Sequence, residues 1–434
     1  MKKIETEILV LGGGLAGTAS ALSARKSGNR VALVCKDGGA SAMSSGALDI
    51  AGDILAITSK PEHWRTDIAE NLEEILIRNP EHPYHLLGDS GEKVLSQIKT
   101  AFEMVFPSSA GFLQGDFARN QKVFNQMGTF KLTAFFQQHM LTLDDLLNAE
   151  HATLINFPEL NDFDGEFFKK NFEYWSSRLD AKTRLSILNA NPGINSSLSC
   201  LEFAKFIEQN TEQILEKLDA NLKKISSQIL VLPPVLPGRK RLQILENLKQ
   251  ASGANVRELL ALPPSVAGKR LQDYLEDSLK FAGVEKLWAK AVSFKCDGKK
   301  IISVQAQNRF DQMEIFAHKF ILASGSFLAG GLTKLGEFKE SIFGLEVFSN
   351  SHPIGKIFTE KLTGLNISAP HPVFSLGVKT SSDQRPIGSD ARIVFENLFA
   401  AGSILSGANY IFDGTGAGVA LATGLSAEEK ASKL

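Results

Sequence analysis

The chain opens with a short apolar run of the kind that forms a strand buried on both faces. Residues 8–11 read Ile-Leu-Val-Leu and lead directly into a glycine-rich turn at 12–17. Small residues then recur along a helical stretch that stops at Gly28, and a second apolar run follows at 31–35. Such runs predict parallel strands, and the small residues predict a helix packed closely on a sheet. The first 35 residues therefore predict a β-α-β unit.

The pattern changes after the first 60 residues and returns near residue 286. Long polar and charged stretches with helical spacing fill 61–285 and indicate a separate, mostly helical lobe. Beyond them, alternating runs at 289–294, 301–306 and 314–323 are separated by turn residues. Three such runs predict an antiparallel β-meander.

A last apolar strand at 398–401 precedes a glycine-rich segment at 414–418 and a helix at 419–425. Both chain ends therefore contribute to one nucleotide-binding lobe, and the middle is inserted into it. The predicted fold class is α/β: a doubly wound, Rossmann-like domain built from both ends, a β-meander and an inserted mostly helical domain. The expected limits are 1–60, 286–330 and 393–434 for the first domain, and 61–285 and 331–392 for the inserted cap domain.

Composition excludes several classes of protein. The 47 Lys and Arg residues nearly balance the 48 Asp and Glu residues, which argues against a nucleic-acid binder. Cys35, Cys200 and Cys296 lie far apart, which predicts no disulfide framework, no metal site and a reducing cytoplasm. No uncharged stretch reaches the roughly 20 residues that a membrane span needs, so we expect membrane contact to be peripheral.

The glycine turn carries the first chemical signal. Gly12, Gly14 and Gly17 form a G-x-G-x-x-G spacing between a strand and a helix, where backbone amides approach a pyrophosphate. The alternative is a purely structural turn. The acidic residue expected on the ribose is absent, because the second strand ends in Cys35 and Lys36. Three explanations stay open: Lys36 contacts a phosphate, Asp37 replaces the acid, or the ligand is a mononucleotide flavin.

Two further segments favour a flavin over a nicotinamide cofactor. Small residues at 40–47 follow the second strand, where a planar ring needs backbone and hydroxyl donors. The glycine-rich helix start at 414–418 directs a positive dipole that would stabilise a reduced flavin ring, unless it is a helix end without a ligand. The candidate cofactor-binding residues are Gly12, Gly13, Gly14, Gly17, Lys36, Ser44, Ser45, Gly46, Ala47, Ser324, Gly325, Gly402, Gly414, Thr415, Gly416 and Ala417.

Several of these segments together resemble a known family. The segments 44–49, 321–325, 397–402 and 414–420 are similar to the subunit designated B of anaerobic glycerol-3-phosphate dehydrogenase. The likeness spans most of the chain and is least distinctive in the helical middle. It implies a fold related to the fumarate reductase flavoprotein and oxidation of sn-glycerol 3-phosphate to dihydroxyacetone phosphate, with electrons passed to quinone.

The resemblance also implies partners and a location. We expect a catalytic partner flavoprotein subunit and an iron–sulfur subunit that anchors the complex at the inner face of the cell membrane. The cofactor is expected to be FMN or FAD, with a slight preference for FMN. Because no His occurs between Arg30 and Lys60, where related flavoproteins carry a covalent attachment site, the flavin is expected to be non-covalent.

The resemblance supplies no catalytic base. Oxidation of an alcohol requires a group that takes the hydroxyl proton, and histidine is the usual candidate near neutral pH. His352 and His371 each precede a proline, as does Arg385, which is able to grip a phosphate or carboxylate. We predict these three as catalytic residues, against the alternative that they are ordinary turn residues. Two other functions stay open: a carboxylate-specific, fumarate-reductase-like oxidoreductase, and a flavin or electron-relay subunit without chemistry of its own.

Overall fold

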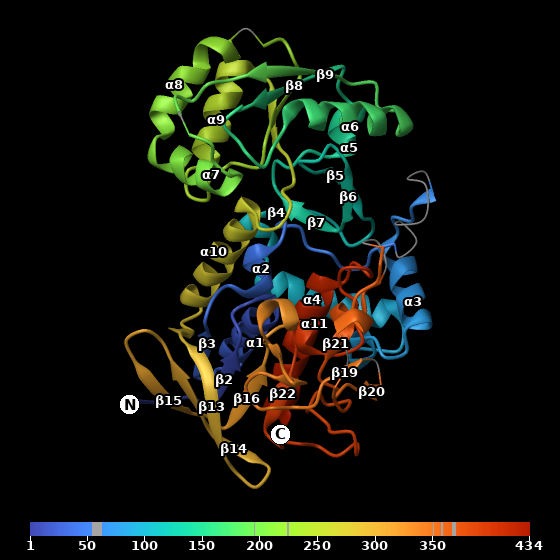
Figure 1. Cartoon of the computed structure of the whole chain (residues 1–434), viewed down its shortest axis with the longest axis vertical. Coiled ribbons are helices and arrows are strands. Elements are labelled where there is room, and N and C mark those ends of the chain that lie inside the picture. Colours follow the sequence, from blue (N-terminus) through green and yellow to red (C-terminus); the bar gives the residue numbers. More distant parts are fainter. Residues whose placement is uncertain (54–62, 195, 224, 350, 357–358, 367–369) are drawn as a thin grey trace.

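The protein is described from a computed structural model. The described residues are 1–53, 63–194, 196–223, 225–349, 351–356, 359–366 and 370–434. Figure 1 shows a larger lobe, which holds both chain termini, and a smaller lobe formed by the middle of the chain.

A five-stranded parallel sheet organises the larger lobe. Its strand order, β12-β3-β2-β16-β22, puts the first strand of the β-α-β unit at the centre. Strands from both chain ends therefore lie side by side, which confirms the predicted Rossmann-like domain. The strands are β2 (Ile8–Leu11), β3 (Val31–Cys35), β12 (Glu285–Trp288), β16 (Lys319–Leu322) and β22 (Leu398–Ala400).

Alternate residues of the central strands bury against different layers. Leu9 and Leu11 pack with the meander, whereas Ile8 and Val10 pack with helices on the opposite face. A strand of four apolar residues is the expected sequence for such a two-sided position. The helices on that face are α1 (Leu15–Lys26), α10 (Val266–Phe281) and α11 (Gly416–Lys433).

The meander is confirmed, with one difference at its third run. It comprises β13 (Lys290–Asp297), β14 (Lys300–Gln307) and β15 (Gln312–Phe316), and β1 (Lys2–Glu5) pairs with β15. The run predicted at 314–323 divides into β15 and β16. Between β15 and β16 the chain crosses from the meander to the central sheet. The connection from β1 to β2 makes the same crossing beside it, and the two are joined by the His318 N–H, which donates to the Glu7 carbonyl at 3.1 Å.

Small residues allow α1 and α11 to pack closely. Ser20 Oγ donates to the Gly424 carbonyl at 2.8 Å. A Cβ added at Gly424 would lie 2.5 Å from the Ala16 carbonyl oxygen, so a larger residue would separate the helices. Helices α3 (Ile68–Arg78) and α4 (Gly91–Val105) share a hydrophobic cluster with them. These two helices therefore pack on the larger lobe, although we expected them in the cap.

The inserted lobe contains a second parallel sheet that the sequence analysis did not anticipate. Its strands, in the order β11-β10-β8-β9, lie among helices α6 to α9 (Figure 1). Runs of four to six residues between long helices do not reveal by periodicity whether they are strands. The elements are β8 (His151–Asn156), β9 (Arg184–Asn189), β10 (Ile229–Leu232), β11 (Asn255–Glu258), α5 (Leu143–Leu147), α6 (Gly165–Arg178), α7 (Cys200–Gln209), α8 (Thr211–Leu222) and α9 (Arg241–Ser252).

Two short antiparallel pairs connect the lobes, and further short strands lie beside the meander layer. The connecting strands are β4 (Leu113–Gly115), β5 (Gln121–Phe124), β6 (Phe130–Thr133) and β7 (Phe135–Gln137). The others are β17 (Leu332–Leu335), β18 (Glu337–Glu340), β19 (Phe348–Ser349), β20 (His352–Pro353) and β21 (Leu376–Gly377). The domain limit expected at residues 60 and 61 lies outside the described residues. No helix in the described part of the chain is both long and apolar enough to cross a membrane.

Candidate functional site

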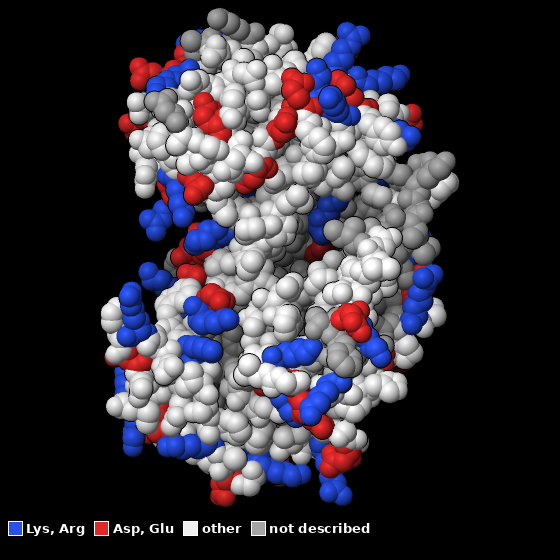
Figure 2. Space-filling model, viewed as in Figure 1, with Lys and Arg blue, Asp and Glu red and all other residues white. Residues whose placement is uncertain are grey.

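The main cavity has a volume of about 510 Å³ and lies at the carboxyl ends of β2, β3 and β16. The start of α11, the short helix α2 (Gly39–Met43) and residues of the inserted lobe complete its wall. Figure 2 shows the surface hollowed between the two lobes. Ligands of open α/β sheets bind at this edge, where connections leave in opposite directions from neighbouring strands.

The first glycine turn has two kinds of glycine. Gly12 has φ +128°, and a Cβ there would lie 2.1 Å from the Ala323 carbonyl oxygen. A Cβ at Gly17 would lie 1.9 Å from the Gly12 carbonyl oxygen. Gly14 has an ordinary φ of −84°, and its added Cβ would meet only Ser41 Oγ, at 3.2 Å. Gly12 and Gly17 are therefore required by packing, whereas neither the backbone angle nor a close backbone contact requires a glycine at position 14.

Polar groups without protein partners surround this turn. The N–H groups of Gly13 and Gly14 have no acceptor among the described residues, whereas the Leu15 N–H donates to Ser41 Oγ at 3.2 Å. Ser324 lies at the end of β16, and its buried Oγ has no hydrogen-bond partner in the described structure. Buried polar groups are rarely left unbonded, so these groups are suited to a polar ligand.

Lys36 occupies the end of β3 and lines the cavity. Its Nζ lies 3.7 Å from Asp37 Oδ2, and its side chain is half exposed. A Cβ at Gly330 would lie 2.8 Å from this Nζ, so the glycine leaves room for the lysine. The neighbouring Cys35 thiol is neutral at physiological pH because burial raises its pKa to about 11.

The segment after α2 contributes to the cavity and also supports the cap. Ser44, Ser45 and Ala47 line the cavity, and the Ser44 carbonyl accepts a hydrogen bond from Ser265 Oγ at 2.6 Å. Gly46 has φ +79° and points elsewhere, since its added Cβ would lie 2.7 Å from Ala267 Cβ on α10. Gly46 thus allows α10 to pack against this segment.

The residues at the start of α11 also fall into two groups, those that line the cavity and those that pack behind it. Gly416 and Ala417 line the cavity, whereas Gly414 packs against Gly52 behind them. The N–H groups of Ala417 and Gly418 both donate to the Asp49 carbonyl, at 3.1 and 3.0 Å. Two amides of the first helical turn are therefore already bonded within the protein, which leaves the Gly416 N–H for a ligand among the described donors there.

The remaining candidates fall into two groups. Gly325 lines the cavity beside Ser324. Thr415 and Gly402 do not: Thr415 Oγ1 lies 3.5 Å from His82 Nε2, and the Gly402 N–H donates to Thr423 Oγ1 at 2.8 Å. The structure therefore brings most of the predicted cofactor-binding residues into one cavity wall. Those that lie behind the wall are Gly17, Gly46, Gly402, Gly414 and Thr415.

Two polar pairs in the cavity were not proposed from the sequence. Asp49 Oδ2 accepts a bond from Lys131 Nζ at 2.7 Å, which joins the larger lobe to β6. Tyr410 Oη lies 2.9 Å from Ser326 Oγ, and burial raises the pKa of this phenol. Asp49 belongs to a segment that the sequence analysis singled out, but Lys131 lies in a stretch without a distinctive pattern.

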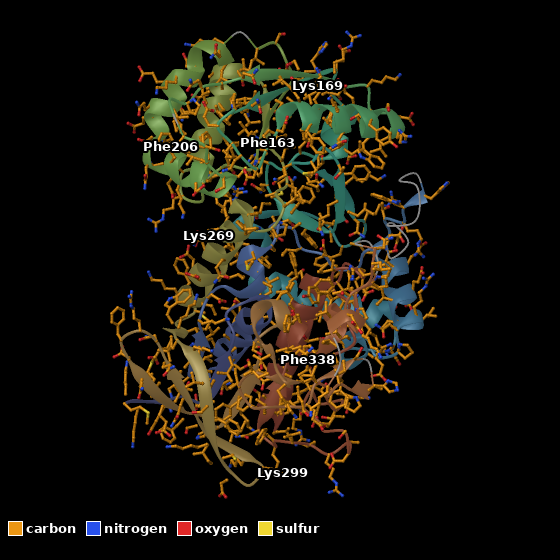
Figure 3. The ribbon with its side chains drawn as sticks, in the orientation of Figure 1. Phe163, Lys169, Phe206, Lys269, Lys299 and Phe338 are labelled. Atoms are coloured by element: carbon orange, nitrogen blue, oxygen red, sulfur yellow. The ribbon has the colours of Figure 1, made fainter. Side chains whose placement is uncertain are left out.

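The predicted catalytic residues are not brought into this cavity. His352 is exposed on β20, and His371 Nδ1 accepts a bond from the Gly364 N–H at 2.8 Å. Arg385 pairs with Asp383 and lines a different hollow, next to Lys299. Figure 3 places Lys299 at the end of the larger lobe farthest from the inserted lobe. The catalytic role of these three residues stays a prediction.

Comparison with known proteins identifies the family. A family model described as "FAD binding domain" matches residues 7–161 and 212–419, well over half of the chain. The chain belongs to the FAD binding domain family. This membership agrees with the Rossmann-like fold and supports a flavin-dependent oxidoreductase. The family description names FAD, whereas the expectation from the sequence was a slight preference for FMN.

Curated relatives confirm the predicted resemblance. The subunit designated B of anaerobic glycerol-3-phosphate dehydrogenase from Actinobacillus pleuropneumoniae serotype 5b (strain L20) is 26% identical, over 98% of each chain. The protein of the same name from Vibrio vulnificus (strain YJ016) is 26% identical over 99% of this chain and 96% of its own. Among solved structures, the open conformation of a flavocytochrome c3 fumarate reductase covers 99% of this chain and 78% of its own, with 11% identity and a TM-score of 0.47.

The residues present in the cavity fit FAD. The unbonded amides of Gly13 and Gly14 suit a pyrophosphate, and Gly14 leaves open the space that a side chain would fill. The partnerless Ser324 Oγ adds a hydroxyl at the end of the neighbouring strand. These groups are among the polar members of a wall that is mostly apolar in area, as expected for a cofactor with flat ring systems.

Proposed function

We propose that this cavity holds FAD non-covalently. The wall that supports the proposal comprises Gly12, Gly13, Gly14, Lys36, Ser44, Ser45, Ala47, Ser324, Gly325, Gly416 and Ala417. The adenosine half belongs near Lys36, because the residue after the second strand reaches the ribose in this fold. No histidine is among the described lining residues and the Cys35 thiol is neutral, so we infer that no side chain bonds covalently to the flavin.

We further propose that the chain takes part in oxidising sn-glycerol 3-phosphate to dihydroxyacetone phosphate. The supporting observation is a cavity at the carboxyl ends of β2, β3 and β16 in a chain whose nearly full length is similar to one subunit, designated B, of anaerobic glycerol-3-phosphate dehydrogenase. When bound, FAD supplies the acceptor of the two electrons that leave the alcohol. The protein's part is to hold the substrate against that acceptor, to exclude water with the inserted lobe, and to take the hydroxyl proton.

We propose that the electrons leave the chain through partner subunits. Relatives are named as a subunit, which supports an assembly with a second flavoprotein and an iron–sulfur protein. Among the described residues, no group of three His, Cys, Asp or Glu side chains is placed to hold a metal ion, so we infer that a metal relay belongs to another polypeptide. A peripheral position at the inner face of the cell membrane suits such an assembly.

A carboxylate-specific oxidoreductase has less support. Recognition of a dicarboxylate favours arginine, whose planar guanidinium binds carboxylates with two bonds. No arginine is among the described residues that line the main cavity, and its cations there are Lys36, Lys131 and Lys290. A lysine binds a phosphate or a carboxylate as a point charge. The described lining therefore lacks the arginines expected for a dicarboxylate, and its lysines are compatible with a phosphate ester.

Purification of the chain tests the cofactor first. We expect a yellow protein whose flavin is released by denaturation and identified as FAD by mass spectrometry. A colourless protein that takes up neither FAD nor FMN would contradict the proposal, and FMN as the sole released cofactor would correct its identity. A flavin that stays with the denatured chain would overturn the non-covalent assignment.

Co-expression tests the subunit assignment. The isolated chain is expected to reduce quinone with glycerol 3-phosphate only slowly and to gain this activity when a second flavoprotein subunit and an iron–sulfur subunit are co-expressed. Rapid quinone reduction by the purified single chain would refute the need for partners. A complex that forms but turns over only other hydroxy compounds would refute the substrate and leave the assembly intact.

A further inference from the structure

Backbone hydrogen bonds of Asp49 and of the residue before it fix this segment at the wall of the main cavity. Its carbonyl accepts from Ala417 and Gly418 at the start of α11. The preceding residue, Leu48, pairs with Phe135 through two backbone hydrogen bonds of 2.7 and 3.2 Å. The backbone at this point is therefore fixed to both the last helix and the strand β7. A carboxylate on such a segment keeps its position when a ligand enters.

The two oxygens of Asp49 have different surroundings. Oδ2 accepts from Lys131 Nζ at 2.7 Å, and Oδ1 is buried with no hydrogen-bond partner among the described residues. The side chain is 20% exposed and lines the cavity, so the carboxylate lies at the border between protein and ligand space. A shielded carboxylate oxygen without a donor is costly, and a ligand hydroxyl would supply the missing hydrogen bond.

The position of Asp49 is suited to a substrate. Lys36 follows β3 on one side of β2, whereas Asp49 is bonded to the start of α11, which follows β22 on the other side. The ribose end of a dinucleotide belongs at the second strand, so Asp49 lies towards the opposite, redox-active end. Lys131 reaches this point from the connecting strand β6. Its ammonium has three donors, and only one is used by Asp49.

We propose that Asp49 accepts the hydroxyl proton of the substrate and that Lys131 is a positioning residue that holds the Asp49 carboxylate in place and binds an anionic group of the same molecule. The substrate class is therefore a hydroxy compound with a nearby phosphate or other anion. This inference rests on the proposed function. In the reaction, the O–H and C–H bonds of the substrate break and a C=O bond forms; the proton goes to Asp49, and a bound FAD would supply the acceptor of the hydride with its two electrons. The proton then passes to solvent.

The test uses the full-length chain loaded with FAD under anaerobic conditions. Asp49→Asn keeps the shape of the side chain and removes its ability to take a proton. Lys131→Met removes the charge, and Lys131→Arg restores it. A matched control is Glu276→Gln, which breaks the ion pair of Glu276 with Lys286 at 3.0 Å outside the cavity. The readouts are FAD content, the affinity for dihydroxyacetone phosphate from the change in flavin absorbance, and the rate of flavin bleaching by glycerol 3-phosphate.

We expect Asp49→Asn to retain FAD and to bind dihydroxyacetone phosphate nearly normally, while bleaching slows about 100-fold or more. The acid limb of the pH–rate profile should disappear in this variant, which a merely structural role would not cause. Lys131→Met should weaken product binding about tenfold, as expected for a lost charge-assisted hydrogen bond, and Lys131→Arg should recover most of it. Glu276→Gln should match the native chain in every readout.

Normal bleaching by Asp49→Asn would overturn the proposal. If Asp49→Asn fails to retain FAD, the test rests on Lys131→Met. An unchanged affinity for dihydroxyacetone phosphate and an unchanged bleaching rate in Lys131→Met would then overturn the proposal. The substrate is tested separately with glycerate and malate. If one of these bleaches the native flavin in an Asp49-dependent way and glycerol 3-phosphate does not, the proposed substrate is wrong and the role of Asp49 stands. If no hydroxy anion bleaches the native flavin, both proposals fall.

Discussion

Arg270 Nη2 donates to Glu258 Oε2 at 2.6 Å, and each side chain is only 3% exposed. Arg270 lies on α10, which returns the chain to the larger lobe, and Glu258 ends β11 in the inserted lobe. Arg270 Nε also donates to Gln137 Oε1 at 2.7 Å. This buried network joins the last strand of the inserted sheet, the connecting strand β7 and α10, and so fixes how the inserted lobe is attached above the cavity.

Removing one member of this pair should be costly. Glu258→Gln is expected to lower the free energy of unfolding by about 3–5 kcal/mol, because it leaves the Arg270 guanidinium buried without a counter-charge. Urea denaturation of the FAD-loaded chain measures the change. The double variant Glu258→Leu with Arg270→Met should be more stable than Glu258→Gln, since no charge is then left unpaired. A loss below about 1 kcal/mol in Glu258→Gln would contradict a buried ionic role.

Gly14→Val should remove FAD without unfolding the protein. The added Cβ meets only Ser41 Oγ at 3.2 Å, so a small shift of this side chain accommodates it, and the valine methyl groups then occupy the space of the pyrophosphate. Gly355→Val is a matched control, because a Cβ there meets nothing within 4 Å. Visible absorbance per chain measures loading, and circular dichroism reports folding. A fully yellow Gly14→Val protein would end the interpretation of this turn as a phosphate site.

Gly12→Ala should behave differently from Gly14→Val. Its φ of +128° and the 2.1 Å approach of the added Cβ to the Ala323 carbonyl would displace β16 from β2. We therefore expect loss of FAD together with a fall in melting temperature, whereas Gly14→Val changes loading alone. Equal melting temperatures for Gly12→Ala and the native chain would show that the turn tolerates a side chain that its geometry excludes.

Lys36→Glu distinguishes between a ribose and a phosphate as the cofactor group that residue 36 contacts after β3. If the ribose of FAD lies at the end of β3, a carboxylate at this position accepts its hydroxyl, and FAD affinity should be kept or increased. If Lys36 contacts a phosphate, the same change introduces repulsion and should weaken binding. Titration of the apoprotein with FAD and with FMN measures both affinities. We expect FAD binding to be retained and FMN binding to stay weaker than FAD binding.

The sequence predicted the parts of this protein that depend on local spacing. Local sequence alone determines the apolar run at 8–11, the turn at 12–17 and the small residues of α1. The structure confirms the strand, turn and helix predicted from them. The inserted sheet was missed because a run such as 229–232 has the same apolar pattern as a buried helix segment. Lys131 was missed because its place beside Asp49 results from packing between lobes. Histidines were selected by chemical type, which carries no information about where the chain places them.

A buried pair beside α11 gives a final prediction on pH. His82 has a side chain with no exposed surface, and its Nε2 lies 3.9 Å from Asp413 Oδ2. Burial lowers the pKa of His82 to about 3, with a smaller effect from His85. Burial raises the pKa of Asp413 to about 6, against a hydrogen bond from the Asn409 backbone. Both groups are therefore less charged in the folded protein than in the unfolded chain.

The two groups change stability in opposite directions as the pH falls. The unfolded chain binds a proton at His82 below its ordinary pKa of 6.5 while the folded protein does not, so stability is lost from pH 6.5 towards 3. The folded protein binds a proton at Asp413 below about 6 while the unfolded chain, with a pKa of 3.8, does not, so stability is gained from pH 6 towards 4. Between pH 7 and 5 these effects are about 2 and about 1 kcal/mol, and they oppose each other.

Single variants should reveal the two opposing effects. Between pH 7 and 5, the free energy of unfolding of Asp413→Asn should fall about 1 kcal/mol more than that of the native chain, because the gain from Asp413 is removed. His82→Gln should fall about 2 kcal/mol less, because the cost of protonating the unfolded histidine is removed. Urea denaturation at both pH values measures these differences, and His151→Gln, at an exposed position, controls for loss of a histidine. Parallel pH dependence in all four proteins would show that neither buried group titrates differently on folding.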